Sequence, residues 1–367
     1  MLPPQEAEKA SIVRALLFDQ TKTPSAFPAF FRLYDFIFCP QTPRGIAIQV
    51  DNPAFKSHAD ILDGANKLCQ KSALTREQFA TILIPDDSIS QRDKNDAVTS
   101  IVRVVFMLDC SLKDKFSDSF EIGGYSPARW ESSEPFITYV KRAIPDCQTQ
   151  HDKGFDAFKH RKTLKAWKLK KRYGLQFRPT DNIAEHLLYD PSTRIVQVFH
   201  HTAYLKAHLK QSKDKPLDHE LSESLKMGSL SPRFLAETLH TIHFILFPIL
   251  NDSSGRSSKL LKSLIKQHNF DPDAEWVEGC IRDDVPTNFT YQYWNSRLEK
   301  LYSLTKNPPP RNRLISWVER HTNERNALTV AILGLFLAAL FGLLACLIGI
   351  AQLAIAILAW RNPRQPS

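Results

Sequence analysis

Seven histidines lie close together in the sequence, and imidazole is the side chain best suited to bind metal ions or move protons near neutral pH. They fall within 58 residues, at His186, His200, His201, His208, His219, His240 and His243. His240 and His243 are three residues apart, which places both on one face of a helix. The chain has no HExxH motif, and no carboxylate is spaced to complete a ligand set. We therefore expect histidines at the edge of a helical core, and we assign no metal, cofactor or catalytic residue.

Sequence motifs of the common enzyme classes are also absent. The chain has no GxSxG nucleophile elbow, no GxxxxGK(S/T) phosphate loop and no GxGxxG fingerprint, and it has only 12 glycines in 367 residues. Catalytic triads need not be contiguous in sequence, so these absences do not exclude catalysis. An enzyme whose site is built from scattered residues near the His186–His243 cluster is the alternative to a non-enzymatic function.

Positive charge is concentrated in one segment. The net charge is +9, and residues 151–182 alone carry 10 basic and 3 acidic side chains. Eight of the basic residues fall within fourteen positions and are our candidate contacts to an anionic surface: Lys159, Arg161, Lys162, Lys165, Lys168, Lys170, Lys171 and Arg172. We expect this segment to be helical, with an apolar face that includes Phe158 and Leu169.

Three interpretations of the basic segment remain open. The first is a solvated helix without a ligand. The second is contact with anionic lipid or an acidic protein, since each Lys or Arg near an anionic leaflet contributes about 1 kcal/mol. The third is nucleic acid, with Trp167, Tyr173 and Phe177 stacking on bases. A membrane tether disfavours the third.

Apolar periodicity predicts a mainly α-helical protein with minor β-structure. Val98, Ile101, Val102 and Val105 define one helix within residues 90–107, and residues 75–78 have the spacing of a capping box. Further helices are predicted after Ser231-Pro232 and along two leucine-rich stripes, 260–265 and 291–301. Strands are predicted only at 46–50 and 194–199.

The expected organisation is a multi-helix body followed by a membrane anchor. We divide the chain into an N-terminal helical region (1–150), a basic helical segment (151–182), a second helical region with a short strand (183–310), a juxtamembrane amphipathic helix (311–326), a transmembrane helix (327–360) and a short tail (361–367). The best linkers are residues 144–154 and the proline run 308–310, because adjacent prolines favour extended, stiff backbone.

The anchor is the strongest signal in the sequence. Residues 327–360 are 34 consecutive positions without a charge, whereas about 20 apolar residues suffice to cross the hydrocarbon core of a bilayer. A single tilted helix that projects beyond the lipid fits this length. Since the stretch ends near the carboxyl terminus, we expect a single-pass, tail-anchored protein.

Flanking charges predict the orientation. Four arginines precede the span, at positions 311, 313, 320 and 325, and two follow it, at 361 and 364, so the positive-inside rule places the body in the cytosol. Unpaired cysteine spacing agrees with a reducing compartment. Two glycosylation triplets, at Asn251 and Asn288, provide a test. We expect Trp317, Arg325, Trp360 and Arg361 to anchor the span at the two membrane interfaces.

Small residues recur every fourth position in the span. Gly334, Ala338 and Gly342 would let two helix backbones approach closely, which predicts a homodimer; chance spacing in an alanine-rich helix is the alternative.

Four stretches resemble a group of filamentous-fungal proteins that have no assigned activity. They are LKKRYGLQFRPTDNIAEHLLYD (169–190), VFHHTAYLKAHL (198–209), RFLAETLHTIHFILFP (233–248) and the C-terminal stretch 317–360. The resemblance covers about the last 200 residues. It implies a single-span membrane protein and carries over no catalytic or binding residue.

The sequence therefore predicts a membrane-bound interaction or scaffold protein. Its partners would be the bilayer itself and an anionic lipid or acidic protein that contacts the basic segment. Which membrane holds it is left open.

Overall fold

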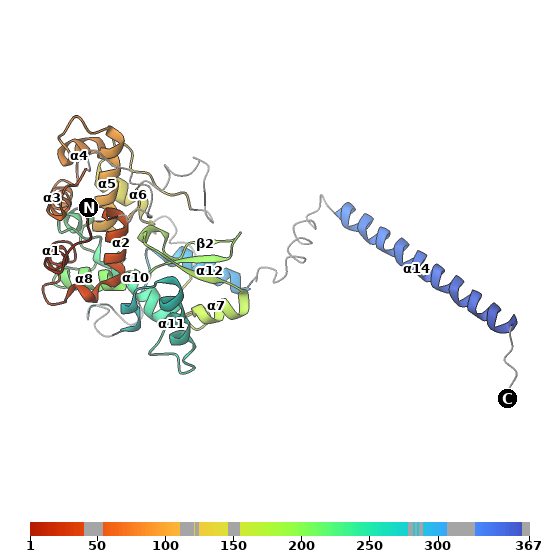
Figure 1. Ribbon diagram of the computed structural model, residues 1–367. Helices are drawn as coiled ribbons and strands as arrows, with labels where there is room; N and C mark the ends of the chain where they lie inside the picture. Colours follow the sequence, from red (N-terminus) through yellow and green to blue (C-terminus); the bar gives the residue numbers. More distant parts are fainter. Residues whose placement is uncertain are drawn as a thin grey trace. The chain divides into compact units, whose positions relative to one another are not determined.

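The computed structural model describes residues 1–39, 54–110, 121, 125–145, 155–277, 282, 285, 289–306 and 327–361. The chain divides into two compact units, Met1–Asn307 and Pro308–Ser367. We call the first unit the body; in the second, the structure describes one helix, α14 (Ala327–Arg361). Figure 1 shows that the body is mainly α-helical with a small sheet, which confirms the predicted fold class.

In the first half of the body the described regular elements are helices, joined by turns and one isolated bridge between Thr75 and Pro135. The elements are α1 (Glu6–Leu16), η1 (Pro24–Ala26), α2 (Pro28–Phe38), α3 (His58–Gln70), α4 (Arg76–Leu83), α5 (Gln91–Phe106) and α6 (Phe136–Ala143). Helix α5 packs against α2, α3 and α4, so it is the centre of this half.

The second half combines helices with the sheet. Its helices are α7 (Ala166–Tyr173), η4 (Ile183–Glu185), α8 (Thr202–Gln211), α9 (Leu221–Lys226), α10 (Pro232–His240), η5 (Thr241–Leu246), α11 (Arg256–His268), η6 (Pro272–Glu275) and α12 (Asn295–Lys306). Of these, η5 is a π-helical continuation of α10.

Local capping explains why several helices begin where the sequence predicts. The Thr75 hydroxyl accepts from the Gln78 N–H at 3.3 Å, and the Gln78 amide oxygen accepts from the Thr75 N–H at 3.1 Å, which confirms the capping box before α4. At the start of α5 the Ser90 hydroxyl accepts from the Asp93 N–H at 3.2 Å. Ser231 lies at the N-cap of α10, but its side chain makes no capping hydrogen bond.

The sheet has three strands, in the order β1 (Gln176–Thr180), β3 (Ile195–Phe199) and β2 (Tyr189–Asp190). Strands β1 and β3 are parallel, with Thr180 opposite Phe199 at their carboxyl ends. Strand β2 pairs with β3 in the antiparallel direction. Helices α7 and α11 pack against β1. Strand β3 confirms the strand predicted at 194–199, whereas the one predicted at 46–50 lies outside the described residues.

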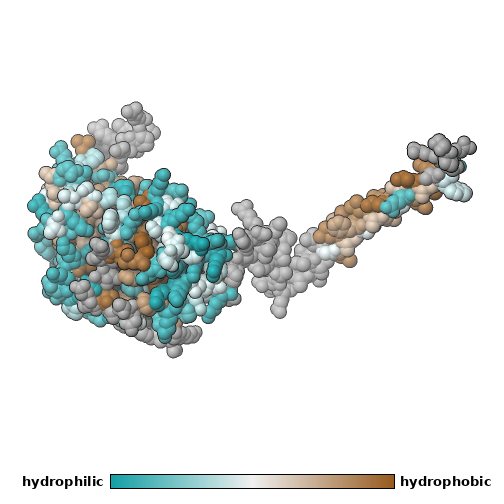
Figure 2. All heavy atoms as spheres, turned by 90° about the horizontal axis from the view of Figure 1, so that it is seen from below, coloured by the Kyte–Doolittle hydropathy of each residue, from teal (hydrophilic) through white to brown (hydrophobic). Residues whose placement is uncertain are grey.

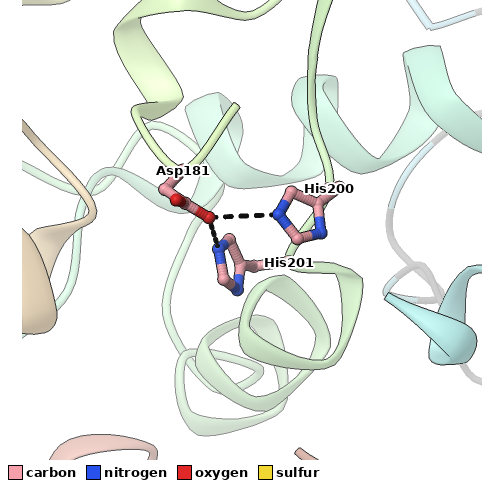
Figure 3. Close-up of side chains that lie close together, drawn as sticks. All are labelled: Asp181, His200 and His201. Atoms are coloured by element: carbon pink, nitrogen blue, oxygen red, sulfur yellow. Dashed lines mark hydrogen bonds and ion pairs between the residues drawn. The ribbon is translucent and has the colours of Figure 1, made fainter. Parts of the chain in front are cut away.

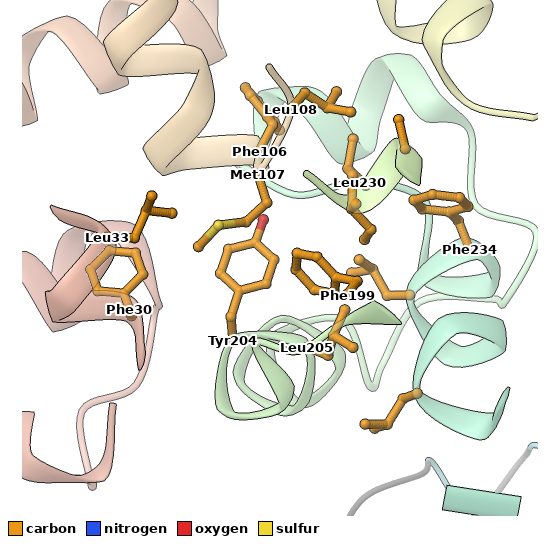
Figure 4. Close-up of a cluster of buried hydrophobic side chains, with 14 of the residues drawn as sticks. Phe30, Leu33, Phe106, Met107, Leu108, Phe199, Tyr204, Leu205, Leu230 and Phe234 are labelled. Carbon is orange, nitrogen blue, oxygen red and sulfur yellow. The ribbon is translucent and has the colours of Figure 1, made fainter. Parts of the chain in front are cut away.

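One hydrophobic core joins the two halves of the body. Figure 4 shows a part of it, where Phe30 and Leu33 of α2 face Met107 at the end of α5, and Tyr204 of α8 lies beside Phe199 of β3. The Tyr204 hydroxyl donates to the Val105 carbonyl at 2.8 Å, so its one polar atom is satisfied within the core.

One prediction about organisation needs correction. Among the described residues of the basic segment, 155–182, the α-helix extends only over Ala166–Tyr173, because Gly174 ends α7 with φ of 70° and residues 176–180 pair with β3. The predicted regions 1–150 and 151–182, and residues 183–307 of the third, fall within the unit Met1–Asn307. The boundary at Pro308 coincides with the predicted proline linker.

Helix α14 has the length and composition expected of an anchor. Within it, Gly334–Leu358 is 25 residues long, apolar enough to cross a membrane, and exposed along its length. Figure 2 shows α14 as hydrophobic along most of its length, in contrast to the largely hydrophilic surface of the body. The predicted juxtamembrane helix, 311–326, and residues 362–367 of the predicted tail lie outside the described residues.

Candidate functional site

The parallel pairing of β1 and β3 brings an aspartate to two histidines. Thr180 and Phe199 lie opposite each other at the carboxyl ends of these strands, so the next residues, Asp181 and His200, emerge side by side. His201, at the N-cap of α8, completes the group. The carboxyl ends of parallel strands are a common location for ligand sites in open sheets.

One carboxylate oxygen links this group (Figure 3). Asp181 Oδ1 lies 3.1 Å from His200 Nε2 and 2.7 Å from His201 Nε2. Both rings are buried, whereas 46% of the Asp181 side chain is exposed. The prediction that no carboxylate completes a histidine set is wrong, because the pairing of β1 with β3 brings Asp181, 19 residues upstream, to His200.

The electrostatics of the group favour an ionised aspartate and a neutral His200. Burial by itself raises the pKa of the Asp181 carboxyl, but hydrogen bonds from His200 and His201 outweigh it and hold that pKa well below its usual range. Burial, with a smaller contribution from His201, lowers the pKa of His200 to about 4. At neutral pH the His200 ring is therefore an uncharged imidazole beside a carboxylate.

Two open cavities meet at Asp181. One has a volume of about 290 Å³ and is polar, with Arg103, Asp109 and Glu185 in its wall. The other has the same volume and is lined by His200 and His268 as well as Asp181. Neither His201 nor His243 lines them. Solvent thus reaches the group through Asp181 and His200.

The other clustered histidines have mainly structural surroundings. His186 accepts from the Phe199 N–H at 3.1 Å and lies 2.7 Å from the Thr241 hydroxyl, while His240 lies 2.6 Å from the Tyr291 hydroxyl. Burial lowers the pKa of each of these two rings. His208 and His243 are buried, and the His243 ring has no hydrogen-bond partner in the described part of the chain. His219 is half-buried.

Half of the predicted basic contacts are used within the body. Lys165 forms an ion pair with Asp252 at 3.3 Å, and Lys168 donates to the Lys162 carbonyl at 2.7 Å. The Arg161 guanidinium stacks 3.9 Å above the Phe158 ring. Lys159 is exposed but lies 3.5 Å from Asp156. These cations are not free to bind an external ligand without losing an internal contact.

Of the remaining predicted cations, Lys162 is exposed before the start of α7, and Lys170, Lys171 and Arg172 are exposed on α7, which adjoins a second basic helix. Helix α11 packs against α7, and its exposed cations recur at spacings of three and four residues, opposite the buried Leu261 and Leu264. We call the combined surface the α7–α11 basic surface; it consists of Lys170, Lys171, Arg172, Arg256, Lys259, Lys262 and Lys266. Across the described ranges, none of these seven has an acidic partner within 4.0 Å. The Arg256 guanidinium lies 4.8 Å from the centroid of the Trp167 ring of α7, so this cation also has a contact within the body.

The four α11 cations were not assigned by the sequence analysis. They are more than 80 residues from α7 in the chain, so no window around the basic segment includes them. The available signal was an apolar stripe whose opposite face carries four basic and no acidic residues over Arg256–His268.

Of the predicted interface anchors, the structure describes two. Trp360 is 87% exposed at the end of α14 and Arg361 follows it; Trp317 and Arg325 lie outside the described residues. A Cβ added to Gly334 or Gly342 meets no other atom within 4 Å, so the small-residue face is open, and homodimer formation remains a prediction.

Comparison with known proteins gives no assignment. Neither protein-family models, nor curated proteins, nor solved structures yielded a match to this chain. The resemblance to filamentous-fungal proteins remains a prediction, and function must be argued from the geometry alone.

Proposed function

We propose that this chain is a single-pass membrane protein whose body binds anionic lipid headgroups through the α7–α11 basic surface. The observation that supports this most directly is the set of seven exposed cations without acidic partners on two packed helices, in a chain that also has the apolar helix α14.

Binding of the body to anionic lipid is favoured because α14 anchors the body to the same membrane, which makes the binding intramolecular. Each Lys or Arg near an anionic leaflet contributes about 1 kcal/mol, and seven such residues are available. An anchored body is also held at high effective concentration beside the lipid. Weak individual contacts therefore suffice.

The last described helix of the body lies beside α7. Helix α12 ends at Lys306 and packs against α7. Tyr302 of α12 stacks on His160 with ring centroids 4.2 Å apart. The end of the body is therefore adjacent to the helix that carries Lys170, Lys171 and Arg172.

The proposed topology is tail-anchored, with the body in the cytosol. The excess of arginines before the span supports this orientation, and the cytosolic leaflet is the one that carries anionic lipid. The flanking arginines and the proposed binding to anionic lipid therefore both support a body that faces the cytosolic leaflet.

Lysine footprinting of the full-length protein in nanodiscs tests the proposal. We expect Lys170, Lys259, Lys262 and Lys266 to be protected from an amine-reactive reagent in nanodiscs with phosphatidylserine, but not in phosphatidylcholine alone. Exposed Lys213 and Lys215 serve as internal controls. High salt should remove the protection, because surface electrostatics are screened.

A matched pair of variants makes the test specific. Lys170→Glu with Lys171→Glu should weaken lipid-dependent protection of the α11 lysines, whereas Lys213→Glu with Lys215→Glu should not. Equal labelling of the α11 lysines in both lipids would exclude the proposal. Protection that appears only after an acidic protein is added would replace lipid by a protein partner.

A further inference from the structure

We infer that Asp181, His200 and His201 form a binding site for a divalent transition-metal cation of the zinc class. The inference is independent of lipid binding, because the three residues lie outside the α7–α11 basic surface. It rests on the placement of three ligand atoms at the carboxyl ends of two parallel strands.

The spacing of the ligand atoms matches a metal coordination shell. One ligand atom from each residue lies within 4.8 Å of the other two, and the Nε2 atoms lie 2.7 and 3.1 Å from Asp181 Oδ1. Ligands about 2.0–2.1 Å from a tetrahedral zinc ion lie roughly 3.3 Å apart. Lengthening the two distances from Asp181 Oδ1 to the Nε2 atoms by about 0.2–0.6 Å would bring both to this value.

The type of ligand selects the class of cation. Two imidazoles and one carboxylate suit zinc, cobalt, nickel and iron, whereas magnesium and calcium prefer shells made of oxygen atoms. Asp181 Oδ2 has no hydrogen-bond or ion-pair partner in the described chain, so the carboxylate can also bind through both oxygens.

The group has both an entry path and room for further ligands. Asp181 lines both adjoining cavities, and His200 lines the one that also contains His268. Three protein ligands plus an open position for water is the arrangement of zinc sites that exchange ligands, as opposed to closed structural sites.

The residues around the three ligands predict a modest affinity for the metal ion. Metal-bound imidazoles usually donate their second N–H to an acceptor, and such partners contribute about 10–100-fold in affinity. The Nδ1 atoms of His200 and His201 are buried without a partner in the described chain. We therefore expect weaker binding than in sites with a complete outer shell, with the ion exchangeable by chelators.

The competing explanation is a purely structural group, in which both imidazoles donate to one carboxylate oxygen and join β1 to α8. Titration of the full-length protein in detergent separates the two. After EDTA treatment and buffer exchange, one equivalent of Zn²⁺ should bind per chain, and Co²⁺ should give the visible absorption bands of a nitrogen- and oxygen-coordinated ion.

Two variants and a matched control assign the site. Asp181→Asn and His200→Gln should each lower Zn²⁺ affinity about tenfold or more, whereas His219→Gln should leave it unchanged. Circular dichroism checks that each variant is folded. If a variant fails to fold, X-ray absorption of the wild-type zinc complex decides: two imidazoles with oxygen ligands are expected.

Absence of Zn²⁺ and Co²⁺ binding by the folded wild-type chain would overturn the inference, as would sulfur ligation or undiminished affinity in Asp181→Asn. Lysine footprinting tests the α7–α11 basic surface and not the metal site. Failure of the metal proposal therefore does not affect the lipid proposal, and the reverse also holds.

Discussion

Lys165 and Asp252 form an ion pair between residues 87 positions apart, with Nζ 3.3 Å from Oδ1. Only 15% of the lysine side chain and 5% of the aspartate side chain are exposed. Asp252 also accepts from the N–H and the hydroxyl of Ser257, in the first turn of α11. The pair therefore ties the start of α7 to the start of α11, the two helices that carry the exposed cations.

Removing one partner of this ion pair should be strongly destabilising. Lys165→Met leaves a buried carboxylate without its cation, and we expect the free energy of unfolding to fall by about 3 kcal/mol. Denaturation of the full-length protein in detergent, followed by tryptophan fluorescence, measures it. Exposed Lys170→Met is the control and should change stability by no more than about 0.5 kcal/mol. A Lys165→Met variant as stable as this control would show that the pair contributes little.

The α11 cations should matter for lipid contact as much as those of α7. Lys259→Glu, Lys262→Glu and Lys266→Glu together reverse charge on α11, and we expect them to abolish the phosphatidylserine-dependent protection of Lys170 and Lys171. Lys159→Glu is the control, because Lys159 already has a partner in Asp156. Protection that survives the triple reversal would restrict the lipid contact to α7.

Buried His243 should make the protein less stable in acid. Burial lowers the pKa of this ring to about 3, whereas in the unfolded chain it is about 6.5. The unfolded state therefore takes up more protons below pH 6.5, and the stability present above that pH is progressively lost toward pH 3. Between pH 8 and pH 5 this one group accounts for a loss of about 2 kcal/mol.

A leucine at this position removes the titration. We expect the free energy of unfolding of His243→Leu, relative to wild type, to rise by about 2 kcal/mol as the pH is lowered from 8 to 5. Urea denaturation at the two pH values measures the change. Ile245→Leu, two residues away in the same core, should show the same offset at both pH values. A pH-independent difference for His243→Leu would contradict the prediction.

Gly228 and Gly255 both have left-handed backbone, but only at Gly228 would an added Cβ also overlap a neighbouring side chain. Alanine substitutions at the two positions therefore measure the cost of backbone strain and the cost of steric overlap separately. Gly228 has φ of 70° and Gly255 has φ of 64°. A Cβ at Gly228 would lie 2.8 Å from Phe18 Cζ, whereas one at Gly255 would meet nothing within 4 Å. We expect Gly255→Ala to cost about 1 kcal/mol and Gly228→Ala about 1 kcal/mol more. Thermal unfolding of the two variants measures this difference, and equal costs would mean that the Phe18 ring moves aside freely.

The orientation of the body can be read from Asn251. This residue begins an Asn-Asp-Ser triplet and is exposed, so a body in the endoplasmic reticulum lumen would be accessible to glycosylation there. We expect no glycan on the protein in a eukaryotic host, and resistance of the membrane-bound protein to carbonate extraction. Insertion of an acceptor triplet after Arg364 should, conversely, yield a glycan if the tail is lumenal. A glycan on Asn251 would reverse the proposed topology.

Much of the helical structure could be predicted because its determinants are local. The Thr75 and Ser90 caps act within one helical turn, and the valine spacing of α5 repeats over the same range, so a short window contains the information. The length of α7 could not be predicted in this way. Residues 176–180 leave the helical pattern to pair with β3, almost twenty residues later in the chain.

The candidate sites differ from the predictions for the same reason. Lys165 and Lys170 look alike in sequence, yet the first is paired with Asp252 and the second is exposed. The α11 cations and Asp181 acquire their significance only from neighbours that the fold supplies.

The sequence alone determined the apolar C-terminal helix, the helical character of the body and the excess of positive charge. These properties depend on composition and on contacts within one or two helical turns. Tertiary structure decided which cations face solvent, and it placed Asp181 against His200 and His201. Both outcomes depend on long-range packing and strand register, and neither is encoded in the spacing of residues along the chain.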